Sequence, residues 1–228
     1  IPVYNSFKRI PSILHALNEQ RHLPYEVIIV DSGNDGKIAK YIFNKKFKYT
    51  LIHKNINKAF PGKARNVGVK IAKGEYFGFI DARTIPDIYW IEKSFSNIKL
   101  DNIKCSIGHV KVQPNNFYQK ILRASSSGIE NKETIVGTVI EKHLFNKTGF
   151  FIENTRAGED IEWINRVKKF KNNVTKRLNL NITYLGLPTN LIDTINKYVI
   201  YSFHTAKVDI QQNMKNSYFI ISLIIFSI

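Results

Sequence analysis

The chain has 228 residues, 43% of them hydrophobic, so it can bury a full core and is not an intrinsically disordered chain. Its formal net charge of +16 at pH 7 fits a nucleic acid partner, an anionic membrane surface, or a lysine-rich composition with solvated side chains. The sequence has no zinc-finger spacing, no RNP-type aromatic motif and no helix-turn-helix pattern, and we therefore expect no nucleic acid partner.

The N-terminal part of the chain predicts strands and helices in alternation. Short apolar runs bounded by turn residues predict strands at residues 1–4, 26–31, 49–52 and 74–81. Helical patterns lie between them, after Pro11, at 38–43 and from Gly62 to Gly74. This alternation predicts right-handed βαβ units, and hence an α/β fold with a mixed, mostly parallel sheet flanked by helices.

The C-terminal part predicts a different organisation. Strand patterns recur at 106–112, 134–140 and 181–184, and helical patterns at 141–146 and 159–170. After Pro188 an amphipathic, aromatic-rich stretch follows, and the chain ends in an apolar run that is too short for a bilayer, which takes about 20 residues. We therefore divide the chain into a domain at 1–187 and a membrane-proximal helical tail at 188–228, which we expect to be truncated.

Two predicted strands end on carboxylates, Asp31 and Asp81. Ligands of open α/β sheets bind outside the carboxyl ends of the strands, so the two acids are candidates for one crevice. Each could instead cap a helix or lie solvated in a loop. Arg83 follows two positions after Asp81, where a second acid would complete a metal-binding pair.

Two helix starts carry further candidates. Lys63 and Arg65 lie in the first turns of a predicted helix, where free N–H groups and the helix dipole attract anions, although a solvated basic turn explains them equally well. Glu159 and Asp160 open a later helix directly after Gly158. Acids in a first turn are ordinary partners of the helix dipole, so their position alone does not require catalysis.

Taken in order, these segments resemble the family 2 glycosyltransferases of GT-A fold. Residues 1–5 resemble their first-strand motif, and 26–33 the strand whose Asp contacts the nucleotide base. Residues 63–68 resemble their Ala-Arg-Asn-x-Gly helix, and 74–83 the strand carrying their Asp-x-Asp motif. Residues 149–151 and 158–163 resemble their Gly-Gly-Phe and Glu-Asp segments. The resemblance covers about the first 170 residues, and the order of the motifs makes it specific.

The resemblance implies transfer of a sugar, with inversion, from a nucleotide-diphosphate donor to a hydroxyl of a glycan or lipid-linked acceptor. Asp160 maps onto the general base of the family, with Glu159 beside it. The positions that match donor-binding segments are Tyr4, Asn5, Asp31, Ser32, Lys63, Arg65, Asn66, Asp81 and Arg83.

The chain departs from the family at Arg83, which replaces the second acid of the Asp-x-Asp motif. In the family this pair usually holds Mg²⁺ or Mn²⁺, which offsets the charge of the departing diphosphate. Asp81 is the only acid of the pair that remains to hold a metal here. We hypothesise that Arg83 binds the diphosphate directly, because its planar guanidinium suits phosphate oxygens.

The resemblance also bears on location and on competing functions. We expect membrane association at the cytoplasmic face of the cell membrane, through the basic and aromatic tail, in synthesis of a surface polysaccharide or glycolipid. The alternative for the tail is a helix packed on the domain. The alternative for the whole chain is a non-catalytic nucleotide- or glycan-binding relative that has lost its metal site. A nucleotidyltransferase would need a Gly-rich basic loop after the first strand, which residues 5–8 do not supply.

Overall fold

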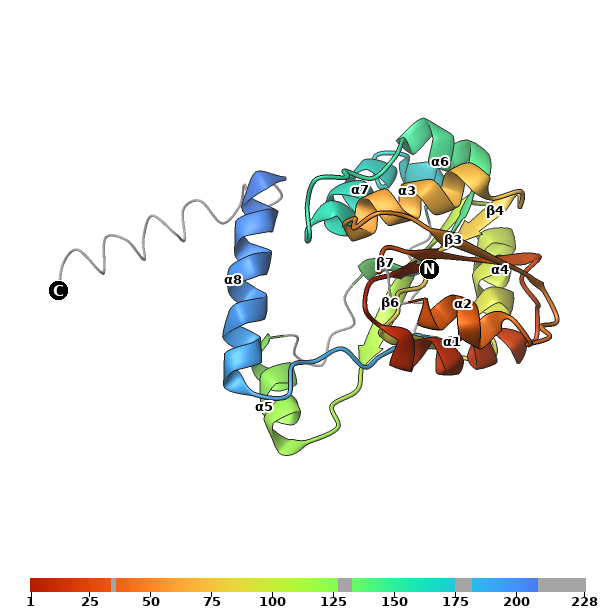
Figure 1. Ribbon diagram of the computed structural model, residues 1–228. Helices are drawn as coiled ribbons and strands as arrows, with labels where there is room; N and C mark the ends of the chain where they lie inside the picture. The colour runs from red at the N-terminus through yellow and green to blue at the C-terminus, as the bar shows by residue number, and fades with distance from the viewer. Residues whose placement is uncertain (34–35, 127–132, 175–181, 209–228) are drawn as a thin grey trace.

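The computed structural model in Figure 1 describes residues 1–33, 36–126, 133–174 and 182–208. Its first sheet has three parallel strands in the order β1, β2, β3, which span Pro2–Val3, Glu26–Asp31 and Thr50–Asn55. Val3 pairs with Asp31 and Asp31 with Asn55, so the carboxyl ends of the three strands share one edge. The short helix η1 (Phe7–Arg9) and helix α1 (Ile10–Asn18) connect β1 to β2. Helix α2 (Lys37–Ile42) lies between β2 and β3.

The second sheet has five strands in the order β4, β7, β6, β8, β5. They span Tyr76–Gly78, Glu133–Glu141, Cys105–Val112, Ile182–Tyr184 and Thr84–Pro86. Only β6 and β8 pair in parallel, whereas the other neighbours pair antiparallel. The expected α/β class with a mixed sheet is confirmed, and parallel strand pairing joins β1 to β2, β2 to β3 and β6 to β8.

One expectation about the sheet was wrong. We expected Asp81 to end a strand of the same sheet as Asp31, but β4 ends at Gly78 and pairs with β7 in the second sheet. The chain leaves the ladder because the carbonyl of Asp81 accepts both the backbone N–H and the hydroxyl of Thr84, at 3.1 and 2.8 Å. Asp81 therefore lies in a turn between β4 and β5.

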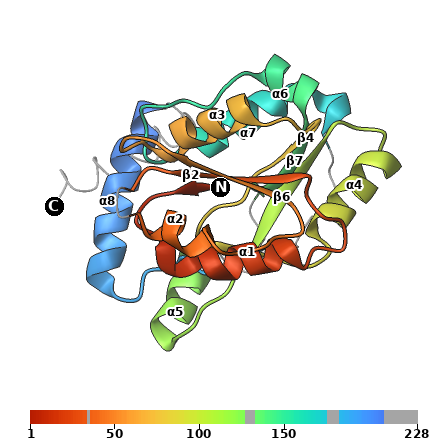
Figure 2. The same cartoon turned by 45° about the vertical axis from the view of Figure 1, so that its right-hand side comes forward.

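Helices cover both sides of the strands. In Figure 2, α3, α6 and α7 lie on one side and α1 and α2 on the other. The helices after α2 are α3 at Pro61–Ile71, α4 at Trp90–Leu100, α5 at Phe117–Ser126, α6 at Lys142–Thr148, α7 at Glu159–Val167 and α8 at Leu191–Lys207, with a short helix η2 at Lys171–Asn173. The helices predicted from periodicity are confirmed, whereas α4, α5 and strand β5 were not predicted.

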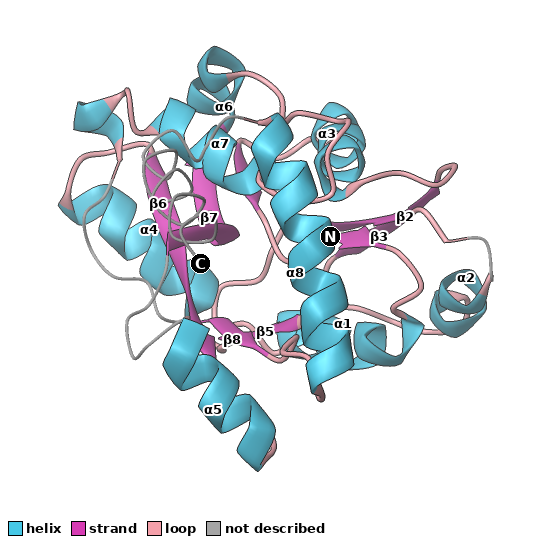
Figure 3. Ribbon diagram, turned by 90° about the vertical axis from the view of Figure 1, so that its left-hand side faces the viewer, coloured by secondary structure: helices cyan, strands magenta, loops and turns pink. Residues whose placement is uncertain are grey.

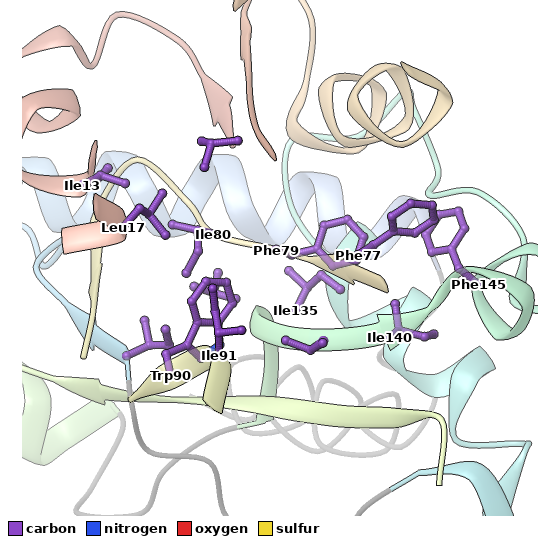
Figure 4. Packing of buried hydrophobic residues seen from close by; sticks show 14 of the residues in the cluster. Ile13, Leu17, Phe77, Phe79, Ile80, Trp90, Ile91, Ile135, Ile140 and Phe145 are labelled. Carbon is purple, nitrogen blue, oxygen red and sulfur yellow. The ribbon is translucent and has the colours of Figure 1, made fainter. Parts of the chain in front are cut away.

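An aromatic cluster fixes the position of α7. Trp163, which is fully buried, stacks on Phe151 with ring centroids 5.0 Å apart and lies 5.6 Å from Phe145. Figure 4 shows Phe77, Phe79 and Phe145 at one end of the core, with Ile13 and Leu17 at the other. Because α7 is packed in this way, its first residues, Glu159 and Asp160, are held against the rest of the domain.

Helix α8 has two different faces. Its inner face contacts the domain through Thr194, which bonds Tyr118 of α5 at 2.7 Å, and through His204, whose carbonyl accepts from Thr155 at 3.3 Å. Its outer face exposes apolar side chains, at Leu191, Ile192, Ile195, Val199 and Phe203. None of the described helices is long and apolar enough to cross a membrane. The predicted final apolar run, 218–228, lies outside the described residues.

Candidate functional site

Arg65 joins three of the segments that carried the sequence motifs. From α3 its Nη1 donates to Oε1 of Glu159 and its Nη2 to Oδ1 of Asp81, each at 2.8 Å. The Arg65 and Glu159 side chains are almost fully buried, whereas Asp81 keeps 35% of its side-chain surface exposed. The structure therefore brings together Arg65, Asp81 and Glu159, and places Asp160 next to them at the start of α7.

The charges of this network shift the pKa values of its members in ways that burial and neighbours explain. Burial lowers the pKa of Arg65, but the negative charges of Asp81, Glu159 and Asp160 raise it by more. The pKa is therefore raised overall, and the guanidinium stays charged. Burial raises the pKa of Glu159, against the attraction of Arg65. Burial likewise raises the pKa of Asp160 above its usual 3.8, and Arg65 opposes the shift. Asp160 thus has the raised basicity that a proton acceptor needs.

Asn66 is held in a structural position. It is 1% exposed, and it exchanges two hydrogen bonds with the backbone of Phe151: Nδ2 donates to the carbonyl and Oδ1 accepts the amide, both at 2.9 Å. Its Nδ2 also donates to Glu153 at 3.0 Å. The side chain therefore fixes the segment leading to α7, while Lys63 on the same helix is exposed to solvent.

The residues at the end of β2 form a compact loop. Asp31 is 3% exposed, and its Oδ1 accepts the backbone N–H of Gly33 at 2.9 Å. Ser32 is also buried, and its hydroxyl donates to the carbonyl of Val3 at 3.0 Å. Tyr4 and Asn5, by contrast, are exposed, and Asn5 has a left-handed φ of 47°. A donor could reach Tyr4 and Asn5 without displacing any side chain of this loop.

Arg83 lies in a cavity that sequence reasoning did not foresee. The cavity has a volume of about 1100 Å³ and is also lined by Asn5, Arg156 and Lys197 of α8. No sequence motif marked Arg156 or Lys197, although Lys197 lies in the amphipathic stretch after Pro188. A second cavity, of about 530 Å³, is lined mostly by apolar residues and, of the predicted site residues, includes only Arg65.

The residues present do not fit the metal site of an Asp-x-Asp pair. One oxygen of Asp81 already accepts from Arg65, and Arg83 supplies a cation where the second carboxylate would be. Across the described ranges, no group of three or more His, Cys, Asp or Glu side chains could hold a metal ion. An arginine next to a single carboxylate repels a divalent cation, so we assign no step to a metal.

Comparison with known proteins identifies the family. A sequence model described as "Glycosyl transferase family 2" matches residues 1–158. The chain therefore belongs to glycosyl transferase family 2, as the resemblance in the sequence suggested.

The relatives and solved structures are consistent with this. An uncharacterized glycosyltransferase of Rickettsia felis is 27% identical over 183 residues, which are 74% of this chain and 30% of that protein. A poly(ribitol-phosphate) beta-glucosyltransferase of Bacillus spizizenii is 39% identical over 88 residues, or 36% of this chain and 14% of that protein. The chain thus spans less than a third of the length of either curated relative.

The fold has a counterpart among solved structures. The structure of S. aureus TarS residues 1–349 in complex with UDP-GlcNAc matches with a TM-score of 0.62 and 19% sequence identity, covering 85% of this chain and 59% of that one. At this identity the likeness shows the fold alone, and it confirms the expected GT-A architecture.

Proposed function

We propose that this protein transfers a sugar from a nucleotide-diphosphate donor to a hydroxyl of a glycan or lipid-linked acceptor. The observation that carries the proposal is the ionic network around Arg65, which joins the turn after β4 to the first residue of α7. This network positions a carboxylate with a raised pKa, Asp160, beside the turn that holds Asp81 and Arg83. Relatives named as glycosyltransferases support the same class of reaction.

In the proposed reaction, Asp160 accepts the proton of the acceptor hydroxyl while that oxygen forms a bond to the anomeric carbon. The bond from the anomeric carbon to the donor phosphate oxygen breaks, and its electron pair stays on the diphosphate. Attack from the side opposite the diphosphate inverts the anomeric configuration. Glu159 and Arg65 hold Asp160 in place and are positioning residues rather than proton carriers.

The donor is proposed to lie along the edge formed by Tyr4, Asn5 and the turn at Asp81. The relative named as a poly(ribitol-phosphate) glucosyltransferase supports an acceptor that belongs to a surface polymer.

The test is turnover of UDP-, GDP-, dTDP- and CDP-sugars by the purified protein, with free nucleotide as the readout. We expect release from one donor, and a loss of about 10²–10⁴-fold in Asp160→Asn, because loss of a general base has this effect. Asp87→Asn, a change in an exposed loop before α4, is the matched control and should retain full activity. Nucleotide binding without any turnover would favour the non-catalytic alternative instead.

We also propose that the tail from residue 188 lies on an anionic membrane surface at the cytoplasmic face of the membrane. Support comes from the outer face of α8, where Ile195, Val199 and Phe203 are 53%, 63% and 60% exposed, and from the net charge of +16. Such a face binds the interface by burying apolar side chains, while basic residues attract anionic lipids.

Vesicle flotation tests this second proposal. We expect binding to vesicles of phosphatidylserine and phosphatidylcholine, weakened by salt and by the triple change of Ile195, Val199 and Phe203 to Ser. Phe43→Ser, which alters an exposed aromatic residue at the C-terminal end of α2, should leave binding unchanged. If the unaltered protein stays with the soluble fraction at low salt, the proposal is wrong.

A further inference from the structure

Helix α8 closes one side of the cavity next to Arg83. The cavity is bounded by the loop after β1, by residues 185–189 after β8, and by α8. Figure 3 shows α8 in front of the two sheets, between β6–β7 and β2–β3. With a volume of about 1100 Å³, the cavity is large enough for a nucleoside diphosphate.

The cavity is strongly cationic. Its basic lining residues are Lys8, Arg9, Lys37, Arg83, Arg156 and Lys197, and its acidic lining residue is Asp193. Asp193 is already engaged, since its carboxylate accepts from Asn190 at 2.9 Å at the start of α8. Within the described part of the chain, no carboxylate pairs with Arg83, Arg156 or Lys197, so none of the carboxylates described there neutralises this charge.

Lys197 is held in place by two tyrosines. Its Nζ donates to the Tyr184 hydroxyl at 3.4 Å and lies 5.4 Å from the centre of the Tyr201 ring. Burial lowers the pKa of Lys197, and the nearby charges of Arg83 and Arg156 lower it further, against the effect of Tyr201. The charges of Arg83 and Arg156 thus oppose the charge of Lys197, and a bound anion would relieve this effect.

The loop after β8 is shaped for this arrangement. A Cβ at Gly186 would lie 2.4 Å from the Tyr184 hydroxyl and 2.9 Å from Cδ of Arg83. The hydroxyl of Tyr184 in turn donates to the Gly186 carbonyl at 3.1 Å. A larger residue at position 186 would therefore require the side chains of Tyr184 and Arg83 to move.

We propose that Arg83, Arg156 and Lys197 together bind the diphosphate of the donor, with α8 supplying one of the three cations. The inference rests on the proposed function and extends it. When the bond to the anomeric carbon breaks, the electron pair adds negative charge to the diphosphate oxygens, and these side chains offset it without a metal ion. The guanidinium groups each present paired donors to phosphate oxygens, and the ammonium of Lys197 adds a point charge.

Calorimetric titration tests the inference with UDP, GDP, their nucleosides and inorganic pyrophosphate, first in excess chelator and then with Mg²⁺ or Mn²⁺. We expect one nucleoside diphosphate to bind in chelator, with an affinity that added metal changes less than about threefold. Lys197→Met and Arg156→Met should each weaken it about tenfold, the loss expected for one charge-assisted contact. Binding of the matching nucleoside should not change.

Lys207→Met provides the matched control, because Lys207 lies on the same helix but contacts Phe203 outside the cavity. It should bind the nucleotide as the unaltered protein does. If a nucleotide binds only with metal, or binds equally well to the Lys197 and Arg156 variants, the inference is wrong while the proposed function stands. If no nucleotide or nucleotide sugar binds under any condition, both are wrong.

Discussion

Asn66 and Phe151 lie 85 positions apart and are joined by two hydrogen bonds of 2.9 Å, in which the amide side chain pairs with the backbone as a strand would. Asn66→Leu removes both bonds and leaves the buried Phe151 groups without partners. We expect a loss of stability on the order of 3 kcal/mol, measured by urea unfolding. Asn196→Ala, at an exposed position of α8, should cost nothing measurable.

Arg65→Met should be among the most damaging single changes, because it leaves the carboxylate of Glu159 buried without its cation. The expected loss is about 3–5 kcal/mol near neutral pH. Without Arg65 the already raised pKa of Glu159 rises further. Protonation of Glu159 then removes the unpaired buried charge, so the stability lost in the variant should shrink as the pH falls. Urea unfolding at pH 8 and pH 5 measures this.

The double variant Arg65→Met with Glu159→Gln separates charge from shape. It should recover part of the stability lost in Arg65→Met at pH 8, and its deficit should depend less on pH. An equal deficit for the single and double variants would show that the buried charge of Glu159 is not the cause.

The fall of kcat/KM at acid pH should report the protonation of Asp160. Burial raises its pKa above 3.8, and only its deprotonated form can accept a proton. We therefore expect kcat/KM to fall as the pH drops through a midpoint above 3.8, with the fold intact by circular dichroism. The residual activity of Asp160→Asn should lack this fall. A midpoint below 3.8 in the unaltered protein would contradict the assignment.

Arg83→Asp should make binding of the nucleoside diphosphate depend on a metal ion, since it restores a second carboxylate two positions after Asp81. In chelator we expect the variant to bind the nucleoside diphosphate at least about tenfold more weakly, since one charge-assisted contact is lost and a repulsive charge is gained. Mn²⁺ should restore much of the loss. Arg21→Asp makes the same charge change at an exposed position. It should bind the nucleoside diphosphate as the unaltered protein does, both in chelator and with Mn²⁺.

Two glycines of α3 should respond differently to alanine. A Cβ at Gly62 would lie 2.1 Å from the carbonyl oxygen of Ile152, so Gly62→Ala must displace the segment that leads to α7. We expect it to cost about 1–3 kcal/mol. At Gly68 the nearest atom would be 3.4 Å away, so Gly68→Ala should be neutral or gain up to about 1 kcal/mol of helix propensity. Thermal unfolding compares them.

The sequence allowed the prediction of those parts whose signals are local. Helices α3 and α7 and strand β2 have periodic apolar residues and clear end signals, and they were found. Helix α4 was missed because Ser94, fully buried, interrupts its apolar stripe; its hydroxyl donates back to the Trp90 carbonyl at 2.8 Å. Strand β5 was missed because it has three residues, too few for a periodic pattern, and because its partner β8 lies far along the chain.

The residues of the candidate site likewise fall into those that the sequence predicted and those that it did not. Motif order was enough to select Arg65, Asp81, Glu159 and Asp160, and the structure brings these four together. It was not enough to show that Asn66 bonds the backbone, nor that a helix near residue 200 brings a lysine close to Arg83. Both depend on contacts between segments that are distant in sequence, which no local pattern encodes.

Among the described residues the two sheets share no strand pairing, and Arg65 connects a helix packed on the first to a turn between strands of the second. We therefore expect Arg65 and Glu159 to support folding cooperativity whether or not a chain of this family is catalytically active. Asp160, by contrast, accepts the backbone N–H of Ile161 at 2.9 Å. Under the proposed mechanism, replacement of Asp160 is therefore the change that removes the proton acceptor while leaving the Arg65–Glu159 pair in place.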